Sequence, residues 1–191
     1  GQFVIQIGRL IGAYVIVSAS KKHEAWLKSQ GAAEVHDYAD AETPKRIADA
    51  HPDIKYAFDT YSMNGSQETI AGILTKEEEN RIVSILSVDE ARVKQINPKT
   101  KATFFILYTV SGKRTEIFGA LFEEDYCKED AEALAKVCSG KDGLFYKLLS
   151  SGAVKPNRTS VQSGGFSGMF QGMDAMRQNK VSGEKLVYPH A

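Results

Sequence analysis

The fold is predicted most clearly by Gly1–Tyr38, GQFVIQIGRLIGAYVIVSASKKHEAWLKSQGAAEVHDY. Apolar residues recur at helical spacing over Gly1–Leu10, which predicts a helix. The β-branched run Tyr14–Val17 is typical of a strand that is buried on both faces. A second helix over Ser20–Lys28, capped by its first residue, and a short strand over 34–36 complete the stretch. Its order is therefore helix, strand, helix, strand.

The same alternation continues beyond this stretch. Helices are expected over Thr43–Ala50 and Gln67–Leu74, the second capped by Asn64, and strands over Ile54–Asp59 and Arg81–Leu86. Helices that alternate with strands across short connections are what right-handed parallel crossovers require. The pattern predicts an α/β fold with a doubly wound parallel sheet.

The regular alternation is expected to end near Asp89. A long hydrophobic strand should follow over Lys101–Val110. The remaining expected elements are three helices and a last strand, over Lys128–Val137, Leu144–Leu149, Phe166–Arg177 and Glu184–Tyr188. In the third of these helices, methionines at helical spacing are expected to belong to a core: Met169, Met173 and Met176. The composition changes near Gly152, where glycine and serine become frequent.

The charges of the chain balance. Its 191 residues carry 24 Lys+Arg and 24 Asp+Glu, with 42% hydrophobic and 25% charged residues. Proteins that bind nucleic acids or anionic membranes usually carry an excess of basic residues. This chain has no such excess, so neither is expected as a partner. No run approaches the about 18 apolar residues of a transmembrane helix. Cys127 and Cys138 are too few for a disulfide framework, which predicts reduced thiols in a cytoplasmic protein.

The segment after the first strand is the candidate binding segment. Enzymes that use NAD carry Asp or Glu at this place, where the carboxylate accepts the ribose hydroxyls. Here two serines and two cations occur instead: Ser18, Ser20, Lys21 and Lys22. Hydroxyls and cations suit the 2′-phosphate of NADPH, which a carboxylate would repel. A helix cap with a solvated surface is the alternative interpretation. Tyr38 ends the next strand, where its ring is a candidate partner for adenine or an ordinary strand-end aromatic.

Other chemistries find little support in the sequence. No tyrosine has a lysine four positions later, as short-chain dehydrogenases require, and neither a G-x-S-x-G elbow nor a G-x-x-x-x-G-K-[ST] loop occurs. A methyltransferase would need a carboxylate after the first strand. The histidines are scattered and, with the two cysteines, offer no close metal-ligand spacing: His23, His36, His51 and His190. No metal site is therefore expected.

Several segments together resemble one enzyme superfamily. They are GQFVIQIGRL at the start, VIVSASKKH, the spacing from Gly31-Ala32 to Asp37-Tyr38, AFDT, and KVSGEKLVY at Lys180–Tyr188. This set resembles the medium-chain dehydrogenase/reductases, in particular the fungal zinc-independent, quinone-oxidoreductase-like enzymes and the trans-acting enoyl reductases. The resemblance covers essentially the whole chain and implies the C-terminal half of such an enzyme.

The resemblance implies a Rossmann-like domain over residues 1–142 and a return segment of the catalytic domain over 143–191. The first strand and the phosphate loop would precede Gly1, so the chain alone is expected to bind the cofactor weakly. The partners it implies are a small-molecule substrate, the N-terminal catalytic domain, and a polyketide synthase or a second copy of the chain. The expected reaction is hydride transfer from NADPH to an activated C=C bond or a quinone. A catalytically silent nucleotide-binding or interaction fragment is the alternative.

The resemblance also implies site residues. The 2′-phosphate contacts fall on Ser20, Lys21, Lys22 and His23, although many relatives carry Pro and Asn in this segment. The adenosine-side tyrosine falls on Tyr38, the nicotinamide end on Ile85 and Leu86, and a late cofactor contact on Val181 and Ser182. The substrate-lining residues fall on Ile106, Leu107, Tyr108, Thr109 and Val110. No catalytic side chain is implied, and Tyr108 is the only local candidate for a proton donor.

Overall fold

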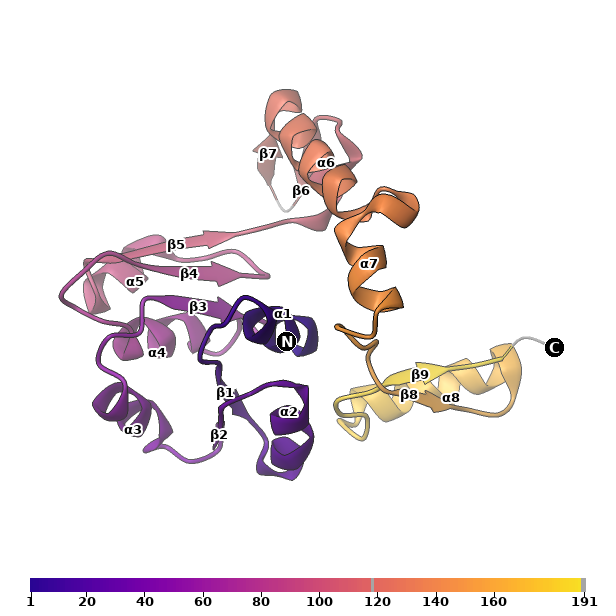
Figure 1. Cartoon of the computed structure of the whole chain (residues 1–191), viewed down its shortest axis with the longest axis horizontal. Coiled ribbons are helices and arrows are strands. Elements are labelled where there is room, and N and C mark those ends of the chain that lie inside the picture. Colours follow the sequence, from indigo (N-terminus) through magenta and orange to yellow (C-terminus); the bar gives the residue numbers. More distant parts are fainter. Residues whose placement is uncertain (118, 190–191) are drawn as a thin grey trace.

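A computed structural model of the protein describes residues 1–117 and 119–189. The first part alternates helices and strands, as Figure 1 shows. In chain order these elements are α1 (Gln2–Leu10), β1 (Ile16–Ala19), the 3₁₀ helix η1 (Lys21–His23), α2 (Glu24–Gln30), β2 (Glu34–Asp37), α3 (Thr43–Ala50), β3 (Tyr56–Asp59), α4 (Ser66–Ile73), β4 (Asn80–Ser84), α5 (Glu90–Ile96) and β5 (Thr100–Phe104).

All strands of this part are parallel. β1 pairs with β2, and β3, β4 and β5 form a second sheet in that order. The parallel pairing across helical connections confirms the predicted α/β architecture. Within residues 1–104 the strands form two separate sheets, and β1 and β3 each keep one unpaired edge. In a doubly wound sheet, the strand that precedes the first crossover helix lies between two strands placed as β1 and β3 are here.

Each sheet has its own apolar core. Ile82 of β4 packs with Ala71, Leu74 and Val93, which lie in or beside α4 and α5. The β1–β2 pair is covered by a smaller cluster that includes Ile5 of α1. Here α1 comes close to the strand, since a Cβ added at Gly8 would lie only 2.8 Å from a methyl group of the residue that precedes β1. A larger residue at this position would push the helix away from the sheet.

Two predicted boundaries are wrong for local reasons. The alternation does not end at Asp89, because the Asp89 side chain accepts a hydrogen bond of 3.0 Å from the Arg92 amide and caps α5. The strand expected over Lys101–Val110 ends at Phe104. The chain then turns into the 3₁₀ helix η2 (Leu107–Ser111), where the amide of Thr109 donates to the carbonyl of Ile106 at 3.3 Å.

Three local predictions about caps and burial are also wrong. The hydroxyl of Ser20 makes no capping hydrogen bond, and the N-cap of α4 is Gly65 and not Asn64, whose side-chain amide donates to the hydroxyl of Tyr61 at 2.8 Å. Tyr14 lies outside β1 and is 65% exposed, although a doubly buried strand was expected there. Its hydroxyl donates to Glu34 at 2.8 Å, so the ring stays at the surface.

An arm follows β5. It comprises η2, the antiparallel strands β6 (Thr115–Ile117) and β7 (Ala120–Phe122), α6 (Glu124–Cys138), the 3₁₀ helix η3 (Gly140–Asp142) and α7 (Leu144–Ser150). The side chains of Thr109 and Cys127 are buried between η2, β7 and α6. Figure 1 shows α6 and the β6–β7 hairpin standing away from the parallel sheets.

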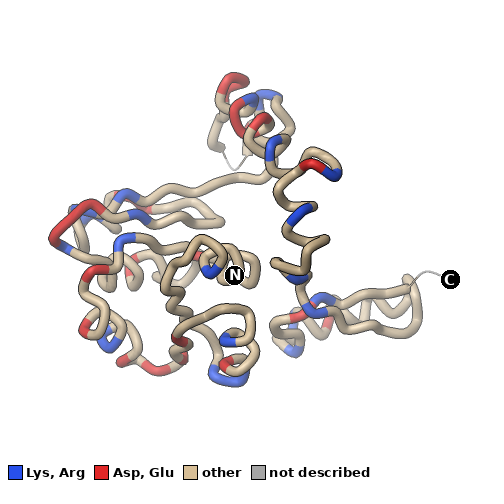
Figure 2. The backbone as a smooth tube through the Cα atoms, in the orientation of Figure 1, with Lys and Arg blue, Asp and Glu red and all other residues tan. Residues whose placement is uncertain are grey.

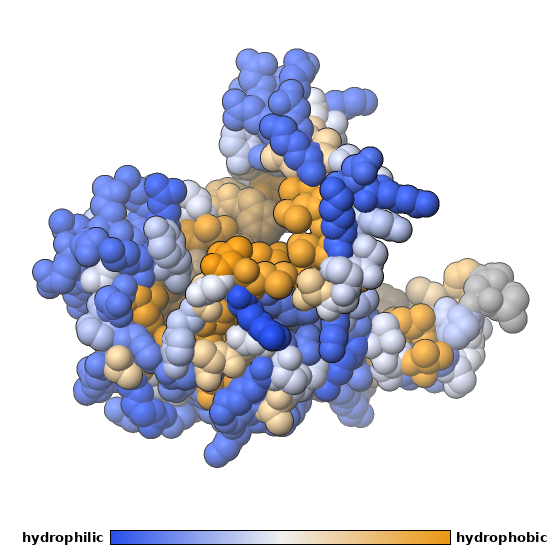
Figure 3. All heavy atoms as spheres, in the orientation of Figure 1, coloured by the Kyte–Doolittle hydropathy of each residue, from blue (hydrophilic) through white to orange (hydrophobic). Residues whose placement is uncertain are grey.

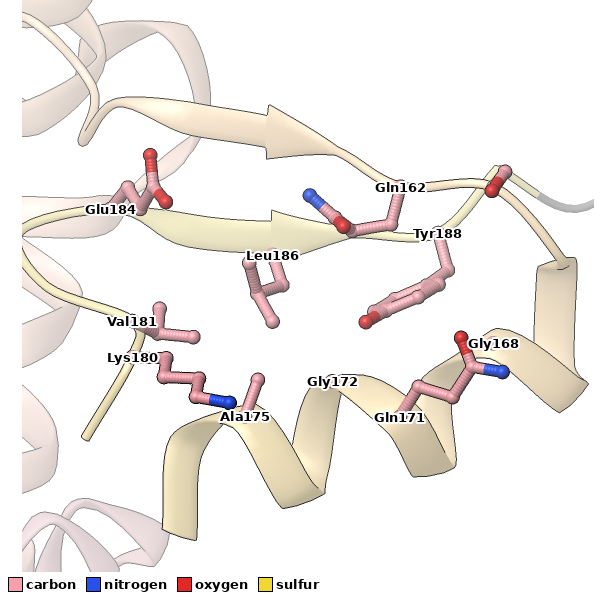
Figure 4. Close-up of a pocket in the computed structure, with 11 residues that line it drawn as sticks. Gln162, Gly168, Gln171, Gly172, Ala175, Lys180, Val181, Glu184, Leu186 and Tyr188 are labelled. Atoms are coloured by element: carbon pink, nitrogen blue, oxygen red, sulfur yellow. The ribbon is translucent and has the colours of Figure 1, made fainter. Parts of the chain in front are cut away.

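The last unit has the order strand, helix, strand. β8 (Thr159–Val161) pairs in parallel with β9 (Lys185–Val187), and α8 (Gly165–Arg177) connects them. The helix turns its glycine face, Gly168 and Gly172, toward the strands, and a cavity of about 270 Å³ lies beside it (Figure 4). The methionines predicted to be core residues are 43%, 44% and 52% exposed, so that prediction is wrong: Met169, Met173 and Met176.

Replacing Gly168 by alanine is expected to destabilise this unit. A Cβ at Gly168 would lie 2.2 Å from the backbone oxygen of Ser163, which cannot move without shifting the loop. We expect the free energy of unfolding, measured with urea, to fall by about 2 kcal/mol. Gly72→Ala in α4 is the matched control, because its nearest neighbouring atom would be 3.9 Å away. That variant should be up to about 1 kcal/mol more stable, and equal effects of the two substitutions would contradict the packing argument.

Candidate functional site

Within each of the two parallel sheets of residues 1–104, the last residues of neighbouring strands are paired, so the carboxyl ends of the strands form one edge. Ala19 of β1 pairs with Asp37 of β2, and Asp59, Ser84 and Phe104 form the last row of the other sheet. Open parallel sheets bind ligands outside the carboxyl ends of their strands. Most of the sequence-predicted residues therefore follow directly at these two edges: Ser20, Lys21, Lys22, His23 and Tyr38 at one, and Ile85, Leu86 and Ile106 at the other.

The turn after β1 presents cations to solvent. Lys21 and Lys22 lie in η1 and are exposed, and within residues 1–117 and 119–189 no carboxylate oxygen lies within 4.0 Å of either ammonium group. Figure 2 shows the basic stretch between β1 and α2. Ser18, near the end of β1, is exposed, and Ser20 is half-buried. The segment thus offers two positive charges and two hydroxyl groups at one strand end.

Tyr38 lies beside this turn. Its amide donates to the carbonyl of Ala19 at 3.4 Å, which places the residue after β2 next to the residue after β1. The Tyr38 side chain is 68% exposed, so the ring is free to stack on a planar ligand. The structure therefore brings the two predicted halves of the adenosine site to one edge.

A segment from the other end of the chain reaches the same point. The His23 imidazole is hydrogen-bonded through Nε2 to the hydroxyl of Ser182 at 2.9 Å. The next carbonyl, of Gly183, accepts a hydrogen bond of 3.1 Å from the side-chain amide of Gln2. Ser182 thus lies at the predicted cofactor edge, whereas Val181 lines the cavity beside α8 (Figure 4).

The electrostatic surroundings of His23 are positive. Burial lowers the pKa of its imidazole below the ordinary value, and the charges of Lys22 and Arg158 lower it further. The ring is therefore neutral at pH 7 and offers one donor and one acceptor. Positive charge at this edge comes from the lysines and from Arg158, and not from the histidine.

A buried carboxylate organises the neighbouring edge. Asp59 ends β3 with 4% exposure, and its oxygens accept hydrogen bonds from the amides of Tyr61 (2.9 Å) and Ser62 (2.8 Å) and from the hydroxyl of Ser66 (2.6 Å). The Ser62 hydroxyl accepts a bond of 3.1 Å from the amide of Ile85, which follows β4. This network fixes the β3–α4 loop against the end of β4.

Apolar side chains surround that network. Ile85 and Leu86 are 38% and 43% exposed, and Phe105, after β5, is 44% exposed. The rings of Phe58 and Phe105 lie with their centroids 6.0 Å apart. Figure 3 shows apolar residues gathered in the hollow at the centre of the molecule's drawn face. This edge can therefore hold the less polar end of a ligand.

The predicted substrate segment is divided by η2. Leu107 and Tyr108 are 67% and 66% exposed, while Thr109 is 1% exposed and its hydroxyl donates to Asp130 of α6. Ile106 and Val110 are half-buried. Of the five residues, two therefore present most of their side chains to solvent, and Thr109 is part of the arm's packing.

The histidines that are scattered in the sequence partly converge. At the amino end of β2, the carboxylate of Glu34 contacts His36 (2.8 Å) and His51 (2.9 Å), and hydrogen bonds from His36 and Tyr14 lower the pKa of Glu34. In the described part of the chain, no group of three or more His, Cys, Asp or Glu residues could hold a metal ion. His190 lies outside the described residues.

Both cysteines are free thiols; Cys127 is buried and Cys138 is exposed. Among the described residues, every helix is too short or too polar to cross a lipid bilayer.

Three residues of the site escape the sequence analysis. Asp59 and Ser62 follow a strand, where polar residues are common, so only the hydrogen bonds reveal their role. Arg158 lies in a segment whose sequence offers no indication that it reaches α2, yet its guanidinium lies 4.1 Å from the ring centroid of Trp26. Contacts between segments so far apart leave no local pattern.

No protein-family model matches the chain. Among curated proteins, an uncharacterized protein of Saccharomyces cerevisiae is 25% identical over 192 residues, covering 98% of this chain and 50% of that protein. A trans-enoyl reductase of Aspergillus niger is 26% identical over 189 residues, with 98% and 50% coverage. The chain therefore spans about half the length of the curated relatives it matches.

Solved structures share the fold. The JamJ enoyl reductase matches with a TM-score of 0.71 at 15% identity, over 99% of this chain and 51% of that one. The quinone oxidoreductase from Coxiella burnetii matches with a TM-score of 0.65 at 20% identity, over 100% and 49%. These matches confirm the predicted α/β fold and agree with the resemblance drawn from the sequence.

Proposed function

The chain resembles the C-terminal half of the medium-chain dehydrogenase/reductases, and we propose from this likeness that it is the NADPH-binding half of such an oxidoreductase. The substrate would be an activated C=C bond, as in an enoyl thioester, or a quinone. Residues 1–142 would bind the cofactor, and residues 143–191 would belong to the catalytic domain. The observation that carries the proposal is the cationic turn after β1, which lies beside Tyr38 and holds no carboxylate partner within 4.0 Å of Lys21 or Lys22 in the described residues.

The residues at this edge fit a phosphorylated ribose better than an unphosphorylated one. The nearest carboxylates in the sequence are already engaged, since Glu24 pairs with Lys28 at 2.8 Å and Asp37 accepts the amide of Ala39 at 3.0 Å. Neither lies in the turn between Ser20 and His23, so the turn itself offers no carboxylate to the ribose hydroxyls. Lys21 and Lys22 supply charge-assisted donors, and the serine hydroxyls supply further donors. This set favours NADPH over NADH.

The chain's own residues would hold and orient the two ends of the cofactor. The cations and Tyr38 bind the adenosine end, and Ile85 and Leu86 present an apolar surface to the nicotinamide end. When bound, the nicotinamide supplies the hydride for an electron-poor carbon of the substrate. Tyr108, which is exposed, is the candidate donor of the accompanying proton on this half.

An activity measurement tests the proposal. A protein that contains this chain is incubated with NADPH and either a crotonyl thioester or a benzoquinone, and the loss of nicotinamide absorbance is followed. We expect turnover with at least one acceptor and much slower turnover with NADH. Binding of NADPH without turnover of either acceptor would instead support a catalytically silent nucleotide-binding module. Absence of binding would contradict both functions.

A further inference from the structure

Arg158 reaches the cationic turn from the C-terminal segment. It lies just before β8, and its guanidinium carbon is 4.1 Å from the centroid of the Trp26 ring on α2. A guanidinium stacked on an indole is held by the ring's negative face while its N–H edge stays free to bond. The stacking therefore fixes the position of the Arg158 guanidinium and leaves its N–H groups available for other hydrogen bonds.

A glycine makes this approach possible. A Cβ added at Gly183 would lie 3.1 Å from Nη2 of Arg158 and 3.1 Å from Cε1 of His23. Arg158 and His23 therefore both border the space beside Gly183, which a side chain at residue 183 would fill. Gly183 has a φ of +71°, in the left-handed region that other residues rarely adopt. Arg158 and the η1 turn are neighbours because residue 183 has no side chain.

The donors of Arg158 are largely unused. Its hydrogen bond within the described residues runs from Nη2 to the Gly183 carbonyl at 3.5 Å, which is long for an N–H···O bond. Within residues 1–117 and 119–189, no carboxylate oxygen lies within 4.0 Å of the guanidinium. The charges of Lys22 and Arg158 both lower the pKa of His23, so the two cations lie close to the same ring. Such a group of cations without anions attracts a phosphate.

We propose that Arg158 is a further specificity-determining residue, whose guanidinium joins Lys21 and Lys22 in binding the 2′-phosphate of the adenosine ribose. This role rests on the proposed function, and it adds a contact from the C-terminal segment to a site that otherwise consists of the strand ends. The segment that carries Arg158 and Ser182 would thereby form part of the phosphate site together with the turn after β1.

Ligand titrations of the chain test this role. The probes are adenosine 2′,5′-bisphosphate, its 3′,5′ isomer of equal charge, and adenosine 5′-monophosphate, and the readouts are the imidazole resonances of His23 and the fluorescence of Trp26, the one tryptophan in the sequence. We expect the wild-type chain to prefer the 2′,5′ isomer. Arg158→Ala should weaken binding of that isomer about tenfold and leave the monophosphate unchanged. Arg158→Lys should have an intermediate effect, since lysine keeps the charge and loses the planar fork.

Two further variants separate the possible outcomes. Arg177→Ala removes an exposed arginine that pairs with Asp174 on its own helix and should change no affinity. Lys21→Ala/Lys22→Ala tests the strand-end site itself. If the lysine variant loses the preference and Arg158→Ala keeps it, or if Arg158→Ala weakens all three ligands equally, Arg158 is a structural residue and the inference is overturned. If the wild-type chain does not distinguish the two isomers, the proposed NADPH site fails and the role of Arg158 with it.

Discussion

Replacing Lys21 and Lys22 together by alanine is expected to weaken NADPH binding about a hundredfold and to leave NADH binding unchanged. Each ammonium would donate a charge-assisted hydrogen bond to the 2′-phosphate, and a hydrogen bond to a charged group contributes about 1.5 kcal/mol, which corresponds to about a tenfold change in affinity. The measurement is calorimetric titration of both cofactors into a protein that contains this chain. The loss for NADPH should shrink at high salt, because ions screen exposed charges.

The control variant removes two lysines that lie at the other ends of the parallel strands, in the β3–β4–β5 sheet. Lys76 and Lys99 are exposed and precede β4 and β5, so they lie at the amino ends of the strands. Replacing both by alanine changes the net charge by the same amount and should leave the NADPH affinity within about twofold of the wild type. An equal loss of NADPH affinity in the two double variants, or an equal loss of affinity for NADPH and NADH, would mean that the turn after β1 does not recognise the 2′-phosphate.

Asp59→Ala is expected to lower the free energy of unfolding by about 3 kcal/mol. The substitution removes a buried acceptor and leaves the amides of Tyr61 and Ser62 and the hydroxyl of Ser66 without their partner. Unsatisfied buried donors cost about 1 to 3 kcal/mol each, and partial solvation of the loop reduces the sum. Asp59→Asn keeps one acceptor oxygen and should lose about half as much. Urea unfolding of the purified chain measures both.

An exposed carboxylate provides the comparison for Asp59. Asp49 on α3 pairs with Lys45 at 2.5 Å, and both side chains are well exposed. Asp49→Ala should change stability by less than about 0.5 kcal/mol, as surface ion pairs contribute little. If Asp59→Ala were no more destabilising than this control, the hydrogen bonds of Asp59 would not hold the loop. Hydrogen exchange at the Ile85 amide should accelerate in Asp59→Ala, since Ser62 then loses its fixed position.

The coupling between Asp59 and Ile85 also concerns the proposed cofactor site. Ser62 lies in the left-handed region with a φ of +55°, a conformation that serine adopts only when its surroundings impose it. The hydrogen bonds to Asp59 and Ile85 provide those surroundings. The apolar surface of Ile85 and Leu86 is thus held in place by a polar network below it. A loosened loop should therefore affect the nicotinamide end before it affects the adenosine end.

The fold class and one half of the candidate site could be predicted from local sequence. Helix and strand periods are local properties, and short connections between them allow only parallel crossovers, so the α/β order was predictable from Gly1 to Leu86. The residues after β1 are consecutive in the chain, and the absence of a carboxylate among Ser18–His23 can be read directly. Both predictions depend only on residues that are close together in the sequence.

The contacts between distant segments could not be predicted in this way, because they depend on tertiary packing. The short helix α5 buries one residue, Val93, and its amphipathic signal was too weak to predict it. The methionines of α8 face outward because Gly168 and Gly172 form the face that packs on the strands, a choice that helical spacing does not reveal. Arg158 meets Trp26 only because a residue without a side chain lies between the two segments at Gly183. Packing depends on which surfaces meet, and a periodic pattern records only which residues share a surface.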